Sequence, residues 1–131
     1  MNKKCISLLL VVVISVFLGA CGKTQAINSV ADLDNILSIS VTLNPPEQTI
    51  VLTDEQLEEV VNIFNDISVG EKDNSYQELN GQYVQFDITK EDGSVLSIAE
   101  LSPYIIVDGI GYKCNDKDCE TLNQFANDLL K

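Results

Sequence analysis

Apolar and polar residues alternate over several short segments of the chain, and this alternation predicts β-strands. The clearest example is 37–44, in which four apolar residues are separated by polar ones: Leu37, Ile39, Val41 and Leu43. Successive side chains of a strand point to opposite faces, so one face of this segment is expected to pack on a core. Pro45 and Pro46 then predict a turn, and 49–52 is expected to return as a short strand.

Four more strands are expected in the second half of the chain, at 83–89, 95–101, 104–107 and 110–114. Turn signals separate them: Lys90-Glu91-Asp92-Gly93, Ser102-Pro103 and Asp108-Gly109. Because short turns join neighbouring antiparallel strands, these segments predict a meander. The polar stretch 71–81 before them is predicted to be a loop.

Two segments have the period of an amphipathic helix. The first begins at Thr53, because Thr53 and Gln56 match a capping box, and Gly70 is expected to end the helical region. Its apolar stripe is Leu57, Val60, Val61, Phe64 and Ile67. The second helix is expected over 118–130, with an apolar face made of Cys119, Leu122, Phe125, Ala126 and Leu129.

The resulting order of elements is β-β-α-β-β-β-β-α. This order predicts an α+β fold in which two helices pack on one face of an antiparallel sheet. The length of the segment allows one core, so we expect a single α+β domain over 35–131.

The beginning of the chain has the organisation of a secretory signal. Lys3 and Lys4 precede an apolar run, 6–18, which leads into Leu18-Gly19-Ala20-Cys21. As a helix of ~1.5 Å per residue, this run reaches about 20 Å and falls short of a hydrocarbon core of ~30 Å. The pattern therefore predicts a signal peptide, 1–20, rather than a permanent membrane span.

Leu18-Gly19-Ala20-Cys21 resembles the lipobox that signal peptidase II cleaves in bacterial lipoproteins. The resemblance implies a diacylglycerol group on the Cys21 thiol and an anchor on the extracytoplasmic face of the cell membrane. Two acyl chains hold a protein stably on a bilayer, at ~0.8 kcal/mol per buried CH₂. Residues 21–34 are then the lipidated N-terminus and a tether. The alternative is an ordinary secretory signal with an incidental cysteine.

The composition makes the processed chain strongly acidic. Loss of Lys3 and Lys4 changes the formal net charge from −12 to −14, since none of the 20 acidic residues precedes Cys21. Such a surface repels nucleic acids, so no nucleic-acid partner is expected. We interpret the acidic residues as a solvated face that keeps the protein soluble, and an acidic recognition patch is the alternative. The lysine-rich, arginine-free composition also resembles that of small lipoproteins of Gram-positive bacteria.

Two cysteines remain after processing, because Cys5 leaves with the signal and Cys21 carries the lipid. Cys114 and Cys119 are an even pair in an oxidising compartment, which predicts a structural disulfide. A redox-active pair is the alternative, but redox motifs have closer cysteines and cationic neighbours. The neighbours of this pair are mostly acidic.

The chain lacks several residue types that catalysis commonly requires. It contains no His, Arg or Trp, so it offers no Ser-His or Cys-His pair, no imidazole ligand for zinc and no guanidinium clamp for phosphate. We therefore expect neither an enzyme nor a cofactor. Paired carboxylates leave a carboxylate-based hydrolase as one alternative.

Two candidate binding features remain. Asp116, Asp118 and Glu120 alternate like the oxygen ligands of a calcium loop, although Gly and Glu are missing at the positions that an EF-hand requires. The alternative is that Asp116 or Asp118 caps the second helix. Tyr76, in the predicted loop, suits a binding surface, and folding back on the core is its alternative.

These patterns together predict a membrane-anchored, extracytoplasmic lipoprotein. Its expected role is that of a non-catalytic interaction module with a surface protein as partner. A calcium-dependent surface module and a carboxylate-based hydrolase are the alternatives.

Overall fold

The structure is a computed structural model that describes residues 24–131. The strands are β1 (Gln25–Ala26), β2 (Ile36–Asn44), β3 (Gln48–Val51), β4 (Ser68–Lys72), β5 (Tyr83–Lys90), β6 (Val95–Leu101), β7 (Tyr104–Val107) and β8 (Ile110–Cys114). The α-helices are α2 (Asp54–Asn65) and α3 (Asp116–Asp128), and short 3₁₀ turns form η1 (Ile27–Ser29) and η2 (Ser75–Glu78).

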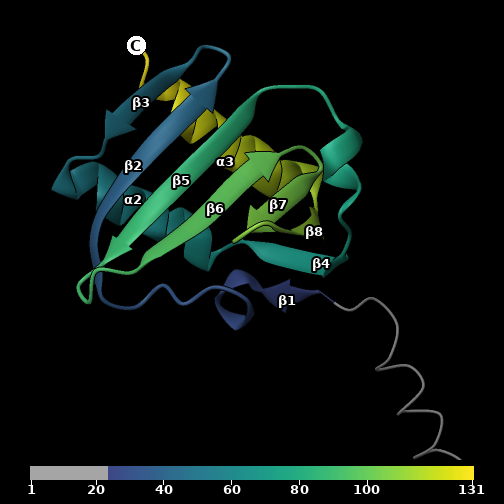
Figure 1. The fold of residues 1–131 in the computed structure, drawn as a ribbon, viewed down its shortest axis with the longest axis horizontal. Helices are drawn as coiled ribbons and strands as arrows, with labels where there is room; N and C mark the ends of the chain where they lie inside the picture. The colour runs from purple at the N-terminus through teal and green to yellow at the C-terminus, as the bar shows by residue number, and fades with distance from the viewer. Residues whose placement is uncertain (1–23) are drawn as a thin grey trace, which may run out of the picture.

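The eight strands form one antiparallel sheet in the order β1-β4-β8-β7-β6-β5-β2-β3. Figure 1 shows α2 and α3 together behind this sheet. The predicted α+β class, with two helices on one face of an antiparallel sheet, is therefore confirmed. Within residues 24–131, no helix has the length and apolar character needed to cross a membrane.

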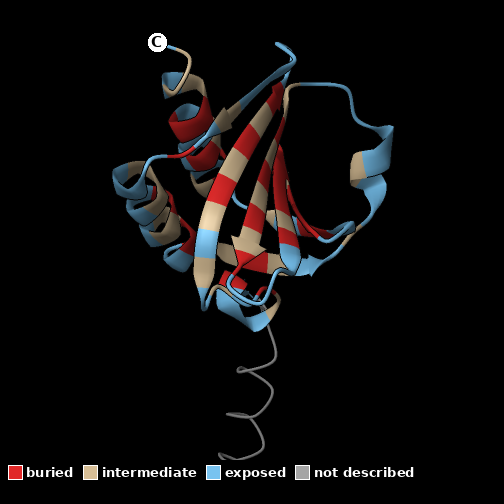
Figure 2. Cartoon of the chain, turned by 60° about the vertical axis from the view of Figure 1, so that its left-hand side comes forward, coloured by how far each residue is buried: buried red, intermediate tan, exposed pale blue. Residues whose placement is uncertain are grey.

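The core lies between the helices and one face of the sheet. On β2, Ile39, Val41 and Leu43 are fully buried and alternate with more exposed polar residues, and Figure 2 shows the same striping along the central strands. Phe86 of β5 lies edge-on to Phe64 of α2, with ring centroids 5.3 Å apart. Its ring centroid is also 6.4 Å from that of Phe125 of α3. One side chain of the sheet thus contacts both helices.

The capping box at the start of α2 is confirmed. Thr53 Oγ1 accepts a hydrogen bond from the Gln56 amide at 3.2 Å, and Gln56 Oε1 accepts one from the Thr53 amide at 3.0 Å. The expected end of this helix is wrong, because α2 ends at Asn65 and Gly70 lies inside β4. Ile67 is buried as expected, but it follows the helix instead of belonging to it.

The structure contains two strands that the alternation did not predict. β4 pairs with β8, with Val69 opposite Cys114, and it includes the first residues of the stretch predicted to be a loop. β1 in turn pairs with β4, with Gln25 opposite Val69. Only Val69 of β4 is fully buried, so pairing with a neighbour, and not a local pattern, makes these segments strands.

The folded unit begins before the predicted boundary at residue 35. Ile27 is fully buried and Ala31 nearly so, and the Ile27 amide donates to the Ile67 carbonyl at 3.0 Å. Lys90, at the end of β5, donates to the Asp34 carbonyl and lies 3.5 Å from the Asp32 carboxylate. The described part of the predicted tether (21–34), residues 24–34, therefore belongs largely to the folded unit.

Leu37 departs from the predicted core face of the first strand. The register of β2 against β5 shifts between Ile36 and Ser38, so Leu37 is the extra residue of a bulge. Its side chain is 63% exposed, while Ile36 packs against the core. A single inserted residue changes which side chains face inward, because the period of a strand is two.

A loop that carries η2 covers part of the other face of the sheet. Tyr76 packs on a small apolar cluster there, and its hydroxyl donates to the Gly109 carbonyl at 2.8 Å. The Gly111 amide donates to Asn74 Oδ1 at 2.9 Å, and the Gly111 carbonyl accepts from the Asp73 amide at 2.9 Å. Tyr76 therefore takes the alternative arrangement, in which the loop aromatic folds back.

Gly111→Ala is expected to displace this loop. A Cβ at Gly111 would lie 2.3 Å from the Asp73 carbonyl oxygen and 2.6 Å from the Tyr76 ring, so the loop has to move or the strand has to strain. Overpacking of this kind costs about 1–3 kcal/mol, which urea denaturation would measure. Gly81→Ala is the matched control, because its Cβ meets only Leu101 Cδ1 at 3.5 Å. Equal stability of the two variants would contradict this account of the loop.

Candidate functional site

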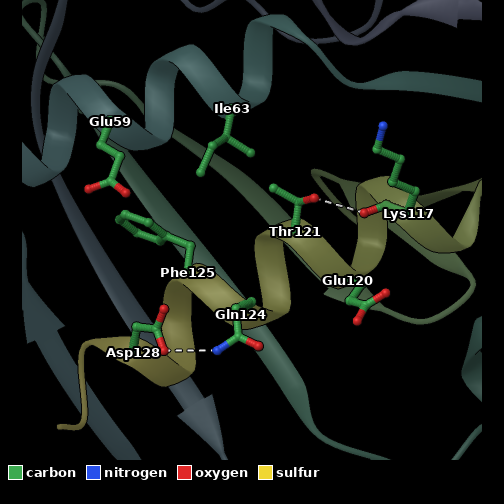
Figure 3. Close-up of a pocket in the computed structure, with 8 residues that line it drawn as sticks. All are labelled: Glu59, Ile63, Lys117, Glu120, Thr121, Gln124, Phe125 and Asp128. Carbon is green, nitrogen blue, oxygen red and sulfur yellow. Dashed lines mark hydrogen bonds between the residues drawn. The ribbon is translucent and has the colours of Figure 1, made fainter.

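A groove lies between α2 and α3 on the helical side of the described residues. Glu59 and Ile63 lie one turn apart on α2, and Thr121 and Phe125 lie one turn apart on α3. Residues spaced by four share a helix face, so each pair presents a single face to the other helix. Figure 3 shows Glu59 and Ile63 directed from α2 toward Phe125 and Thr121.

The groove encloses about 380 Å³ and continues toward the C-terminus into a second hollow of about 260 Å³. Both hollows share Glu59, Phe125 and Asp128, and the second ends at Lys131. Ile63 and Phe125 supply apolar surface at the floor. The groove therefore follows α3 over most of its length.

A polar row borders the groove on α3. Glu120, Gln124 and Asp128 are spaced by four residues and lie on one side of the helix. Gln124 Nε2 donates to Asp128 Oδ1 at 2.8 Å, and Lys131 Nζ donates to the same oxygen at 2.9 Å. The hydrogen bond from Lys131, followed by that from Gln124, lowers the pKa of Asp128. Asp128 is thus partly neutralised, whereas no lysine among residues 24–131 lies within 4 Å of the Glu59 or Glu120 carboxylate.

The outer surface of the helical layer is strongly acidic. Its exposed carboxylates, on the two helices and at the C-cap of α2, are Asp54, Glu55, Glu58, Glu59, Asp66, Asp116, Glu120 and Asp128. The lysines on this side are Lys117 and Lys131. The sequence alone showed acids on both helices, but it could not show which of them border one groove, because that depends on how the helices pack together.

A third hollow, which shares Glu120 with the groove, is lined by a buried carboxylate. Glu100 is 1% exposed on the core face of β6, and it lines a hollow of about 380 Å³ together with Glu120 of α3. Ser102 Oγ donates to Glu100 Oε1 at 2.7 Å, and Asn123 Nδ2 donates to Glu100 Oε2 at 3.4 Å. Burial raises the pKa of Glu100, and the two hydrogen bonds oppose this rise.

Amide side chains extend this network from the sheet to α3. Gln82 Oε1 accepts from Asn123 Nδ2 at 3.0 Å and from Asn127 Nδ2 at 2.9 Å, while Gln82 Nε2 donates to the Pro45 carbonyl at 2.8 Å. Both carboxylate oxygens of Glu100 accept from protein donors, so this side chain links α3 to β6. The alternation of 95–101 places Glu100 in phase with Leu96 and Ile98, and this signal was present in the sequence.

The three residues of the predicted calcium loop do not converge on a common point. Asn115, rather than Asp116 or Asp118, caps α3, with Asn115 Oδ1 accepting from the Asp118 amide at 2.8 Å. Asp118 Oδ2 accepts from the Ser68 amide at 3.1 Å and from Asn115 Nδ2 at 2.9 Å, and Glu120 borders the hollows. Within residues 24–131, no group of three or more acidic or cysteine side chains is placed to hold a metal ion.

Cys114 and Cys119 are brought together at the start of α3. Cys119 is fully buried on the predicted apolar face of the helix, and both residues are free thiols in this structure. The hydrogen bond with Cys114, followed by burial, raises the pKa of the Cys119 thiol. A raised pKa disfavours the reactive thiolate, which argues against the redox-active alternative, while the predicted disulfide is not formed in this structure and stays a prediction. Cys21 lies outside the described residues, and its lipidation stays a prediction.

Comparison with known proteins supplied no relative from which a role could be transferred: no protein-family model, curated protein or solved structure matches this chain. The functional argument therefore depends on the residues themselves.

The wild type is expected to lose stability, relative to the Glu100→Gln variant, as the pH rises. The folded state favours the neutral carboxyl, while the unfolded chain ionises near pH 4.5. The contribution of Glu100 is therefore complete below about pH 4.5 and is lost as the pH rises through its higher folded-state pKa. The free energy of unfolding of the wild type, relative to Glu100→Gln, should fall with pH in urea titrations.

Glu58→Gln is the matched control for this titration, because Glu58 is exposed on α2 and its loss removes the same charge from an acidic protein. A pH trend of the same size in both variants would show that overall charge, and not burial of Glu100, causes it.

The disulfide between Cys114 and Cys119 is expected to form in protein isolated from cells without reductant. Closing a loop this short stabilises a fold by about 2 kcal/mol in the chain-entropy model. Intact mass after alkylation should show neither thiol labelled, and reductant should lower the urea midpoint. The double variant Cys114→Ser, Cys119→Ser should not respond to reductant. Complete alkylation of both residues without reduction would rule out the disulfide.

Proposed function

We propose that this protein is a lipid-anchored, extracytoplasmic interaction module that binds a partner protein through the groove between α2 and α3. The observation that carries the proposal is the groove itself, which combines an apolar floor at Ile63 and Phe125 with acidic borders. Ile63 is half-buried and Phe125 is 7% exposed, so the apolar part of the groove is small, and polar residues frame it as they do at many protein-binding sites. The lipobox at Cys21 supports the anchor.

The position of β1 supports an orientation on the membrane. Cys21 precedes Gln25 by four residues, which span at most about 14 Å when extended. A lipid on Cys21 therefore keeps the β1 edge of the sheet close to the bilayer, and β3, at the opposite edge, lies farthest from it. Ile63, at one end of the groove, lies two residues before Asn65, which bonds to Asn28 next to β1, and the groove continues to Lys131 near the distal C-terminus. A partner beside the membrane can reach it along its whole length.

The chemistry of the groove favours binding over catalysis. Thr121 lines the groove, and its Oγ1 donates to the Lys117 carbonyl at 2.9 Å, so its proton is directed to the backbone and not to a general base. The other polar groups are carboxylates, one amide and lysine. Such groups form ion pairs and hydrogen bonds with a partner surface.

A photo-crosslinking amino acid at Thr121 should capture a partner protein in intact cells, since Thr121 is exposed in the groove. The same probe at Thr49, exposed on the sheet face away from the helices, should capture much less. Gel mobility and mass spectrometry identify the adduct.

Cys21→Ser tests the anchor in the same cells. This variant should lose the lipid, leave the membrane fraction and give at least tenfold less adduct at Thr121, because the local concentration of the partner falls. Equal capture from Thr49 and Thr121, or no adduct from either, would contradict the proposed function.

A further inference from the structure

We infer that the groove between α2 and α3 binds an extended, lysine- or arginine-rich segment of its partner, with an apolar side chain placed between two cationic ones. This inference rests on the proposed function, since it takes the groove as the interaction surface, and it adds the chemistry of the occupant. Three features carry it: the charge of the helical layer, the apolar floor and the spacing of the acids.

The distribution of charge selects a cationic occupant. Among residues 24–131, Lys72 and Lys113 lie on β4 and β8, and Lys90 is buried at the end of β5. Lys131 is paired with Asp128, so Lys117 is the remaining cation beside the groove. Opposite charges on two surfaces raise the rate at which the two proteins meet, and like charges disfavour wrong partners. An acidic or phosphorylated segment would meet repulsion along the same path.

The floor selects an apolar anchor. Phe125 packs beneath against Phe86 and is only 7% exposed, so the half-buried Ile63 of α2 is the residue of the floor that an anchor can cover. Covering this surface excludes water from apolar atoms, at about 25 cal/mol per Å² of area buried. Ion pairs at an exposed border contribute about 0.2–1 kcal/mol each, so the anchor and the charges have to act together.

The spacing of the acids fits an extended segment. Glu120 and Asp128 lie eight residues apart on α3, or about 12 Å at ~1.5 Å per residue, and Glu59 stands on the other side. In a strand, residues i, i+2 and i+4 point the same way, and i to i+4 spans about 13 Å. A Lys-x-Leu-x-Lys pattern therefore places one ammonium group at Glu120, a second at Asp128 in exchange for Lys131, and a leucine over the floor.

Two peptides of one composition test this pattern: acetyl-Gly-Lys-Ser-Leu-Ser-Lys-Gly-amide, and a scrambled form with the order Lys-Ser-Ser-Leu-Lys at its centre. Titrated by calorimetry into full-length protein in a non-ionic detergent, the first should bind at least tenfold more tightly than the second. Its affinity should fall with salt, since exposed ion pairs are screened. Equal affinity of both peptides would overturn the inference.

Charge-reversed variants separate the groove from general attraction to an acidic protein. Glu59→Lys with Glu120→Lys should weaken binding of the first peptide at least tenfold. Glu47→Lys with Glu91→Lys, both exposed in turns and neither of them lining the groove, makes the same change in net charge and should weaken it less than threefold. An equal loss in both pairs would place the attraction in the overall charge and overturn the inference.

The floor is tested by Ile63→Ser against Val51→Ser, a residue that is 71% exposed on β3. Only Ile63→Ser should weaken the first peptide, and circular dichroism verifies the fold of each variant. If Ile63→Ser does not fold, the charge-reversed pairs decide alone.

Crosslinking at Thr121 distinguishes failure of this inference from failure of the proposed function. Capture that persists in Glu59→Lys with Glu120→Lys overturns the basic occupant and leaves the interaction module intact. Absence of any adduct at Thr121 in the wild type overturns both.

Discussion

Contact of Phe86 with both helices is the interaction on which the rest of this structure depends. Two short helices have to cover the apolar face of an eight-stranded sheet, and Phe86 lies between them on β5. Its edge-on contact with Phe64 and tilted contact with Phe125 set where α2 and α3 lie relative to each other. Aromatic pairs of this kind add about 0.5–1.5 kcal/mol beyond the area that they bury.

The groove is a direct consequence of this arrangement. With Phe64 and Phe125 directed at one ring, Glu59 and Ile63 come to lie opposite Thr121 and Phe125. The residues that hold the core together therefore also create the floor of the candidate site. Its acidic borders come from the solvent-facing residues of the same two helices.

Polar contacts fix the ends of the helical layer. The network of Glu100, Gln82 and Asn123 ties α3 to the sheet, and Asp118 ties the start of α3 to the Ser68 amide of β4. At the other edge, Ile27 packs under α2 and joins the N-terminal segment to the fold. Directional bonds of this kind specify a position, whereas apolar contacts mainly specify a face.

The sequence by itself determined the elements whose signals are local. Alternation and turn residues predicted β6, β7 and β8 with the bounds that the structure has, and Thr53 with Gln56 predicted the start of α2. Tertiary structure alone decided that Ser68–Lys72 is a strand, that Leu37 bulges outward and that Ile27 is buried. It also decided which acids share the groove. A local pattern shows which face of an element is apolar. It does not show which distant segment the element pairs with, because several neighbours are compatible with the same pattern and the pairing adds no periodicity to either segment.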